Sequence, residues 1–183
     1  MDYYVLQVAP REEEKTERHI KSLLPDNVYG ECFHPTRLMR KKFHGRWVEV
    51  RERLLPGYVF ITAEDAVSLF LYLKKIPLLT KLVGRDMEYF TRLSGREAQW
   101  LEIMGHEAGL SQIDIDEGNE ISIISGPLAG MEGMVRKINL HKMLAEVEVP
   151  FMNGCTVIHL GIEMVEKKGN NRCRNTAERS INS

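Results

Sequence analysis

The sequence has little cysteine, no long apolar run and almost no net charge. Its three cysteines, Cys32, Cys155 and Cys173, are an odd and scattered set in 183 residues. Such a set excludes a disulfide framework and indicates reduced thiols in a cytoplasmic protein. No run approaches the roughly 18 apolar residues of a membrane span, and the first residues do not form a charged-then-apolar signal peptide. We therefore expect a cytoplasmic protein with no membrane partner.

The patterns that carry catalysis are also missing. No nucleophile elbow, phosphate loop or paired-carboxylate arrangement stands out, so we expect no enzyme and no cofactor. Cys32 and His34 lie two positions apart, and Cys155 and His159 lie four apart. These residues do not form closely spaced ligand couples, and they fall in different predicted domains. We therefore expect no metal site.

The formal net charge of −1 hides an uneven distribution. Residues 1–104 hold 17 Lys and Arg against 15 Asp and Glu, whereas residues 112–168 hold 5 against 9. The first part can therefore carry a local basic site although the whole chain is not basic.

The first hundred residues alternate between strand and helix patterns. Strand patterns lie at residues 3–8, 29–34 and 58–62, and helical patterns lie at residues 11–24, 67–75 and 94–104. The last helix begins with a capping box, Ser94-Gly95-Arg96-Glu97. This order predicts an α+β domain over residues 1–104, with one sheet covered by helices on a single face.

Two stretches of this domain are basic. Between Arg37 and Arg53 there are seven basic and two acidic residues around a central glycine, which predicts a basic β-hairpin with its turn at Gly45. In the first helix, Ile20, Leu23 and Leu24 fall on one side, and the opposite side holds Arg11, Lys15, Arg18 and Ser22. That basic side is either a solvated face or a nucleic-acid surface.

The character of the chain changes after residue 104. Residues 105–115 are predicted to be a linker, and short Val- and Ile-rich runs then predict a barrel of about five strands over residues 116–168. We expect a turn at Gly126-Pro127, a positive φ at Gly130 and a close backbone approach at Gly133. Residues 169–183 are polar and predicted to be disordered.

Three motifs, in this order, resemble the NusG family of transcription elongation factors. They are YYVLQV at residues 3–8, LLPGYVFI at residues 54–61, and EGNEISIISGPLAGMEGMVRKI at residues 117–138, which looks like a KOW motif. The resemblance extends to about Lys168. It implies an N-terminal NGN domain, an α/β sandwich that grips RNA polymerase, and a C-terminal KOW β-barrel that binds a second partner.

The resemblance also implies a polymerase-binding face. In the family, an open apolar face of the NGN sheet takes the clamp helices of the largest RNA polymerase subunit. The matching positions here are Tyr3 in the first strand and Leu55 and Tyr58 in LLPGY. The alternative is that all three are ordinary core residues.

Specialised members of the family read a nucleic-acid hairpin with the first helix and the end of the second. The matching residues here are Arg11, Lys15, Arg18, His19, Lys74 and Lys75. The basic hairpin is a competing site, through Arg40, Lys41, Lys42 and Arg46. Three interpretations of it stay open: contact with upstream DNA, contact with a polymerase surface, or a solvated loop.

The KOW barrel of the general factor binds the termination factor Rho or a small ribosomal subunit protein. The matching candidates are Phe151 and Met152, and family members often carry an aromatic residue where Met152 stands. Our hypothesis is a specialised paralogue of the LoaP kind, which suppresses termination on specific operons after recognising an RNA hairpin. The alternatives are the general factor, acting with Rho or coupling transcription to translation, and a free-standing KOW-type RNA-binding module.

Overall fold

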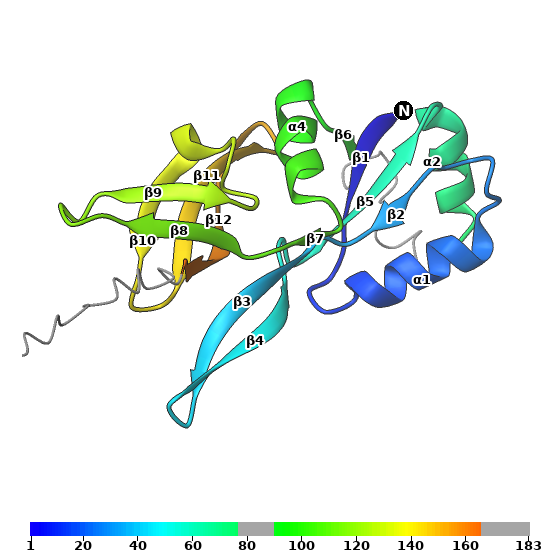
Figure 1. Ribbon diagram of the computed structural model, residues 1–183. Helices are drawn as coiled ribbons and strands as arrows, with labels where there is room; N and C mark the ends of the chain where they lie inside the picture. The colour runs from blue at the N-terminus through cyan, green and yellow to red at the C-terminus, as the bar shows by residue number, and fades with distance from the viewer. Residues whose placement is uncertain (77–89, 166–183) are drawn as a thin grey trace, which may run out of the picture.

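A computed structural model describes residues 1–76 and 90–165 (Figure 1). Its first sheet is antiparallel, with strand order β2-β5-β1-β6. The strands are β1 (Asp2–Gln7), β2 (Cys32–Phe33), β5 (Tyr58–Ala63) and β6 (Phe90–Arg92). Because successive side chains point to opposite faces of a strand, β1, β2 and β5 each contribute to two separate cores.

Two helices cover one face of this sheet. Ile20 of α1 (Glu13–Leu23) and Leu69 of α2 (Ala66–Lys74) are fully buried in one cluster with Leu6 and Ile61 of the sheet. The prediction that Leu23 belongs to the apolar side of α1 is wrong, because that side chain is 56% exposed. The buried positions of α1 are instead Glu13, Thr16 and Ile20, which follow the helical steps of three and four.

The third helix lies on the opposite face. α4 (Gly95–Met104) begins with the predicted capping box, in which the Ser94 N–H donates to Glu97 Oε2 at 2.7 Å. Its Trp100 and Leu101 are buried in the same cluster as Val5 and Phe60, whose side chains leave the sheet away from α1 and α2. The expectation of helices on a single face is therefore wrong, because α4 buries its apolar side between the sheet and the C-terminal strands.

The predicted basic hairpin is present. β3 (Thr36–Phe43) and β4 (Arg46–Arg53) pair antiparallel around His44 and Gly45, which both have positive φ, as in a two-residue hairpin turn. β7 (Glu107–Ala108) adds a short parallel strand to β3. Residues 1–76 and 90–108 are called the N-terminal lobe below.

The C-terminal strands form a five-stranded half-barrel, residues 111–165. The strands, in the order β10-β11-β12-β8-β9, are β8 (Ser111–Ile115), β9 (Ile121–Ser125), β10 (Val135–Asn139), β11 (Leu144–Phe151) and β12 (Gly154–Met164). A 3₁₀ turn, η1 (Glu132–Met134), precedes β10. The predicted number of strands is confirmed. The linker predicted at residues 105–115 is wrong, because β7 and β8 form there through pairing with distant strands.

The glycines of the KOW-like segment have different roles. Gly126 has φ +89°, and a Cβ there would lie 2.6 Å from the Leu110 carbonyl oxygen and 2.6 Å from Ser111 Cα. Gly130 has φ +95°, which confirms its predicted positive φ, and nothing lies within 4 Å of a Cβ there. The close approach predicted at Gly133 is wrong, since nothing lies within 4 Å of a Cβ there.

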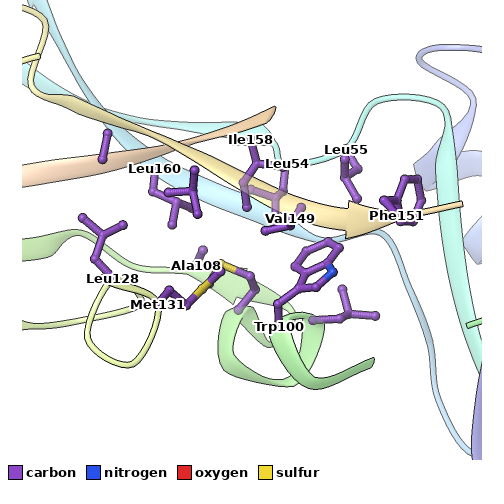
Figure 2. Packing of buried hydrophobic residues seen from close by; sticks show 14 of the residues in the cluster. Leu54, Leu55, Trp100, Ala108, Leu128, Met131, Val149, Phe151, Ile158 and Leu160 are labelled. Atoms are coloured by element: carbon purple, nitrogen blue, oxygen red, sulfur yellow. The ribbon is translucent and has the colours of Figure 1, made fainter. Parts of the chain in front are cut away.

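One core crosses from the N-terminal lobe into the half-barrel (Figure 2). Val5, Phe60 and Trp100 belong to the same buried cluster as Val149 and Leu160 of the half-barrel. The half-barrel therefore covers the sheet face that α1 and α2 leave open. None of the described helices is long and apolar enough to cross a membrane.

The two glycines of positive φ give a matched pair of variants. Gly130→Ala is expected to lower the free energy of unfolding by about 1 kcal/mol, the cost of a left-handed backbone for alanine. Gly126→Ala should cost about 3 kcal/mol, because the methyl group must also displace the Ser111 backbone. Urea denaturation followed by circular dichroism measures both values, and equal costs would contradict the close approach at Gly126.

Candidate partner-binding site

The three residues predicted to bind polymerase lie on the sheet face that the half-barrel covers. Leu55 is buried, and Tyr3 and Tyr58 are half-buried against the shared core. The Tyr58 ring meets the ring of Phe151 edge-on, with centroids 4.9 Å apart and an interplanar angle of 89°. Phe151 is a residue that we predicted to bind the second partner. The structure thus brings the two predicted contact sites together.

Phe151 is the centre of an aromatic cluster that joins the two parts. Its ring centroid lies 6.2 Å from that of Phe60 and 6.3 Å from that of Trp100. Aromatic rings at these separations and angles attract one another beyond the burial of their area. Met152 is half-buried beside the same core, with φ +53°. The four residues Tyr58, Phe60, Trp100 and Phe151 are called the aromatic cluster below.

Polar contacts fix the end of β11 and the turn after it next to this cluster. The Trp100 indole N–H donates to the Pro150 carbonyl at 2.8 Å. Burial raises the pKa of the Glu97 carboxyl, but hydrogen bonds from Ser94 and from the backbone N–H groups of Met152 and Asn153 outweigh it, and the net pKa is lowered. The turn between β11 and β12 is therefore held by a charged side chain of α4.

The β3–β4 hairpin also contacts the half-barrel, through polar side chains and a close approach of β3 to β12. Arg37 Nη1 donates to the His159 carbonyl at 2.8 Å, and Arg40 Nη1 lies 3.7 Å from Glu163 Oε2. A Cβ on Gly161 would lie 2.3 Å from the Leu38 carbonyl oxygen. Only glycine lets β12 approach β3 at this distance.

Part of the predicted polymerase face stays accessible. A hollow of about 480 Å³ is lined by Tyr3, Leu93, Glu97 and Asn153, among others. Burial, and secondarily the charges of Glu102 and Glu31, raise the pKa of the Tyr3 hydroxyl. This hollow has a mostly polar lining and includes neither Leu55 nor Tyr58, so it is not the apolar face that the resemblance implies.

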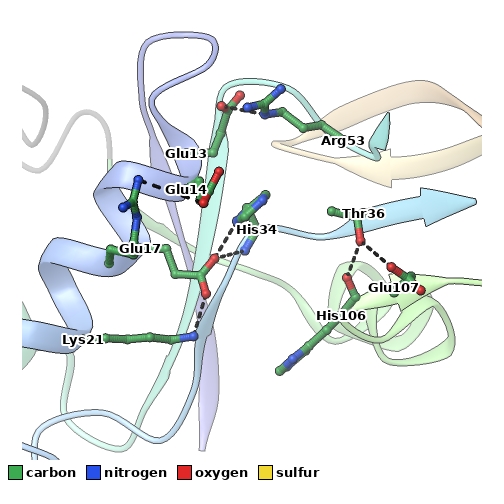
Figure 3. A network of polar contacts seen from close by, with 10 residues as sticks. Glu13, Glu14, Glu17, Lys21, His34, Thr36, Arg53, His106 and Glu107 are labelled. Carbon is green, nitrogen blue, oxygen red and sulfur yellow. Dashed lines mark hydrogen bonds and ion pairs between the residues drawn. The ribbon is translucent and has the colours of Figure 1, made fainter. Parts of the chain in front are cut away.

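A buried carboxylate holds the LLPG segment in place (Figure 3). Glu13 is fully buried; its Oε1 accepts the Gly57 N–H at 2.7 Å, and its Oε2 lies 2.9 Å from Arg53 Nε. Gly57, with φ +88°, also accepts the Val8 N–H at 2.8 Å. Leu55 and Tyr58 flank this anchored glycine, so Glu13 positions both of them.

The cations of the first helix are largely paired with acids of the same helix. Lys15 Nζ lies 2.8 Å from Glu12 Oε2, and Arg18 Nη2 lies 4.0 Å from Glu14 Oε1. The His19 Nδ1 lies 2.7 Å from the Lys15 carbonyl oxygen. A shallow hollow of about 290 Å³ is lined by Lys15, Arg18, His19 and Ser22. The structure therefore gathers most of the predicted nucleic-acid residues of α1, but with part of their charge neutralised.

A neighbouring acid, Glu17, ties α1 to the sheet. It accepts from Lys21 Nζ at 2.5 Å and from the His34 N–H at 3.1 Å (Figure 3). Burial raises the pKa of the Glu17 carboxyl. The hydrogen bonds with Lys21 and His34 outweigh this effect, so the pKa is lowered overall. The contacts of Glu17 with Lys21 and His34 therefore have a structural role.

The remaining predicted cations lie on α2 and on the hairpin. Lys74 Nζ lies 4.5 Å from the Phe70 ring centroid, and Lys75 Nζ lies 4.8 Å from that of Tyr72. On the hairpin, Lys41 pairs with Glu52, whereas Lys42 and Arg46 are exposed near the tip. Arg11, before α1, is also exposed.

The cysteines do not gather with other metal ligands. Burial raises the pKa of the Cys32 thiol to about 12, whereas Cys155 is exposed on β12, and neither forms a disulfide. Cys173 lies outside the described residues. Among residues 1–76 and 90–165, no three His, Cys, Asp or Glu side chains are placed to hold a metal ion.

Comparison with known proteins gives the family. The family model for NusG, described as "Transcription termination factor nusG", matches residues 1–102, more than half of the chain. The chain belongs to the NusG family.

Full-length relatives support the NusG assignment. The chain is similar to the transcription termination/antitermination protein NusG of Thermus thermophilus, 25% identical over 181 residues that cover 91% of this chain and 98% of the relative. NusG of Neisseria meningitidis is 23% identical over 90% of this chain and 97% of its own length. A solved structure described as "Domain interaction in Thermotoga maritima NusG" matches with TM-score 0.50 and 20% identity, covering 87% of this chain and 93% of that one. This likeness supports the NusG fold.

Sequence reasoning missed the packing roles of Trp100, Glu97 and Glu13 around the candidate site. Glu13 looked like one of three acids that favour a helix N-terminus, and its burial depends on where β5 runs. Trp100 offered a weak signal, because a tryptophan with apolar neighbours at helical spacing indicates a buried face. Neither pattern says that the face would pack on the half-barrel.

The anchoring by Glu13 gives a second matched pair. Glu13→Ala removes the acceptor of the Gly57 N–H and leaves Arg53 without its partner, so we expect the free energy of unfolding to fall by about 2–3 kcal/mol. Glu14→Ala, one residue away on the exposed side, should cost no more than about 0.5 kcal/mol. Urea denaturation tests both, and a Glu13→Ala protein as stable as the wild type would refute the anchor.

Proposed function

We propose that this NusG-family protein regulates transcription elongation by binding RNA polymerase through the sheet face around Tyr3, Leu55 and Tyr58. The partner segment is the pair of clamp helices of the largest polymerase subunit. The contact between Tyr58 and Phe151 supports the proposal best. In this contact the half-barrel covers the part of an apolar sheet face that α4 of the N-terminal lobe leaves uncovered.

The docked arrangement also supports a mechanism that regulates polymerase binding. Leu55 and Phe151 are buried and Tyr58 packs on Phe151, so most of both proposed contact sets is unavailable while the half-barrel is docked. Binding then requires the open form, and the apparent affinity of polymerase is reduced by the fraction of open molecules. A protein that captures Phe151 and Met152, such as Rho or a small ribosomal subunit protein, would thereby assist polymerase binding.

Two variants should move clamp-helix binding in opposite directions. Gly161→Ala forces β12 away from the Leu38 carbonyl, and each ~1.4 kcal/mol lost from docking raises the open fraction tenfold until that form dominates. We expect about tenfold tighter binding to a peptide with the clamp helices, measured by calorimetry. Tyr58→Ala should weaken binding by about tenfold, since it removes an aromatic anchor.

The control is Val48→Ala, an exposed position on β4, which should bind as the wild type does. Unchanged binding in Tyr58→Ala, with Gly161→Ala also unchanged, would remove the polymerase assignment. RNA binding without any clamp-helix binding would instead favour the free-standing KOW-type module.

We further propose the specialised role, in which the protein recognises an RNA hairpin and suppresses termination on specific operons. The support is the shared exposed side of Lys15, Arg18 and His19 and the hollow between them. The residues proposed to contact RNA are Arg11, Lys15, Arg18, His19, Lys74 and Lys75. The pairs with Glu12 and Glu14 must exchange for phosphate contacts, so binding should depend strongly on salt.

Charge reversal tests this role. Lys15→Glu combined with Lys74→Glu should weaken binding of a leader RNA hairpin about tenfold or more in a mobility-shift assay, because two phosphate contacts become repulsive. Lys137→Glu, an exposed reversal on β10, should leave binding unchanged. Equal binding of a scrambled hairpin, unaffected by the double reversal, would exclude the specialised role and leave the general factor.

A further inference from the structure

A second basic surface lies between the hairpin and the half-barrel, away from the aromatic cluster. Two adjoining hollows of about 590 and 580 Å³ share Arg40, Trp47 and His141. The hairpin β3–β4 forms one wall, and the turn between β10 and β11 forms the other. Together the two hollows are called the hairpin cleft below.

The charge of the hairpin cleft is positive although the chain is slightly acidic. Its lining contains four permanent cations, Arg40, Lys41, Lys42 and Lys142, against one carboxylate, Asp114. Arg40 pairs with Glu163 and Lys41 with Glu52, so these two are partly neutralised. Lys42 and Lys142 are exposed, with no ion pair among the described residues, and they line the same hollow from separate walls. The site therefore suits an anion.

The cleft also presents aromatic rings, which an inorganic anion would not need. Phe43 is 52% exposed and Trp47 is 42% exposed. Trp47 stands directly opposite Lys42 in the hairpin register, so a ring and a cation share one side of the hairpin. Exposed aromatic rings between cations are the arrangement on which bases of single strands stack while their phosphates are neutralised.

From this juxtaposition, we propose that the hairpin cleft binds single-stranded nucleic acid, with a base stacked on Trp47 and the backbone held by Lys42 and Lys142. A duplex does not fit this chemistry, because its bases are already stacked on one another. The site is distinct from the polymerase face and from the side of α1 proposed to read an RNA hairpin.

The cleft exists only while the half-barrel is docked, since its walls come from the two parts. Gly161 lets β12 reach the hairpin, and Arg40 spans the gap to Glu163. A single strand in the cleft therefore favours the docked form, whereas clamp helices on the covered face favour the open form. The two ligands must weaken each other's binding by the same factor.

The test is a titration of the full chain with a fluorescently labelled ten-nucleotide single strand of mixed sequence, as RNA and as DNA, followed by anisotropy. Trp47→Ala should lower the affinity about tenfold, the effect of losing one base-stacking partner. Lys42→Ala with Lys142→Ala should lower the slope of log K against log salt by about 1.4, since each phosphate contact on a single strand contributes about 0.7. Lys137→Ala is the matched control and should bind as the wild type does.

The following outcomes decide the proposal. Gly161→Ala should weaken oligonucleotide binding while it strengthens clamp-helix binding. Wild-type affinity in Trp47→Ala, or equal binding of a duplex of the same sequence, would overturn the stacking site. Trp47→Ala should leave clamp-helix binding unchanged, so failure of the cleft and failure of the polymerase assignment are distinguishable. Binding in either arm supports the site, and the stronger arm identifies RNA or DNA as the source.

Discussion

The insertion of the Phe151 ring among Tyr58, Phe60 and Trp100 is the interaction on which the arrangement of this protein depends. It completes a core that neither part can close alone, because the sheet has apolar side chains on both faces and only one face has α1 and α2. The hydrogen bond from Trp100 to Pro150 and the contacts of Glu97 with the turn between β11 and β12 then fix the orientation in which the half-barrel docks. Apolar burial supplies the attraction, and the polar groups select one orientation.

Much of the fold follows from local patterns. The capping box at Ser94 and the turn at His44-Gly45 each depend on neighbours in sequence, and the structure confirms both. β7 and β8 were not predictable, since they are short strands whose pairing with β3 and β12 is set by tertiary contacts. Leu23 shows the same limit: two adjacent leucines cannot both face the core, and the sheet beneath α1 selects Leu24.

The sequence offered candidate residues for the site but could not show how they pack together. The family resemblance gave Tyr3, Leu55, Tyr58 and Phe151 as contact residues for two different partners. No periodicity could show that Tyr58 and Phe151 meet each other, because that contact joins strands more than ninety positions apart. The ion pairs of the first helix were also not predictable. The wheel of the first helix shows its cations, but the pairs of Lys15 and Arg18 with acids on the same helix become visible only once side chains have positions.

The connection between the two parts is short. β7 ends at Ala108 and β8 begins at Ser111, so only Gly109 and Leu110 join them. Two residues span at most about 7 Å, so in the open form proposed above the half-barrel would stay on a very short tether, at a local concentration in the millimolar range or above. Return to the docked position is thus a first-order process that dilution does not slow. Any partner that keeps the protein open has to outcompete a neighbour that never diffuses away.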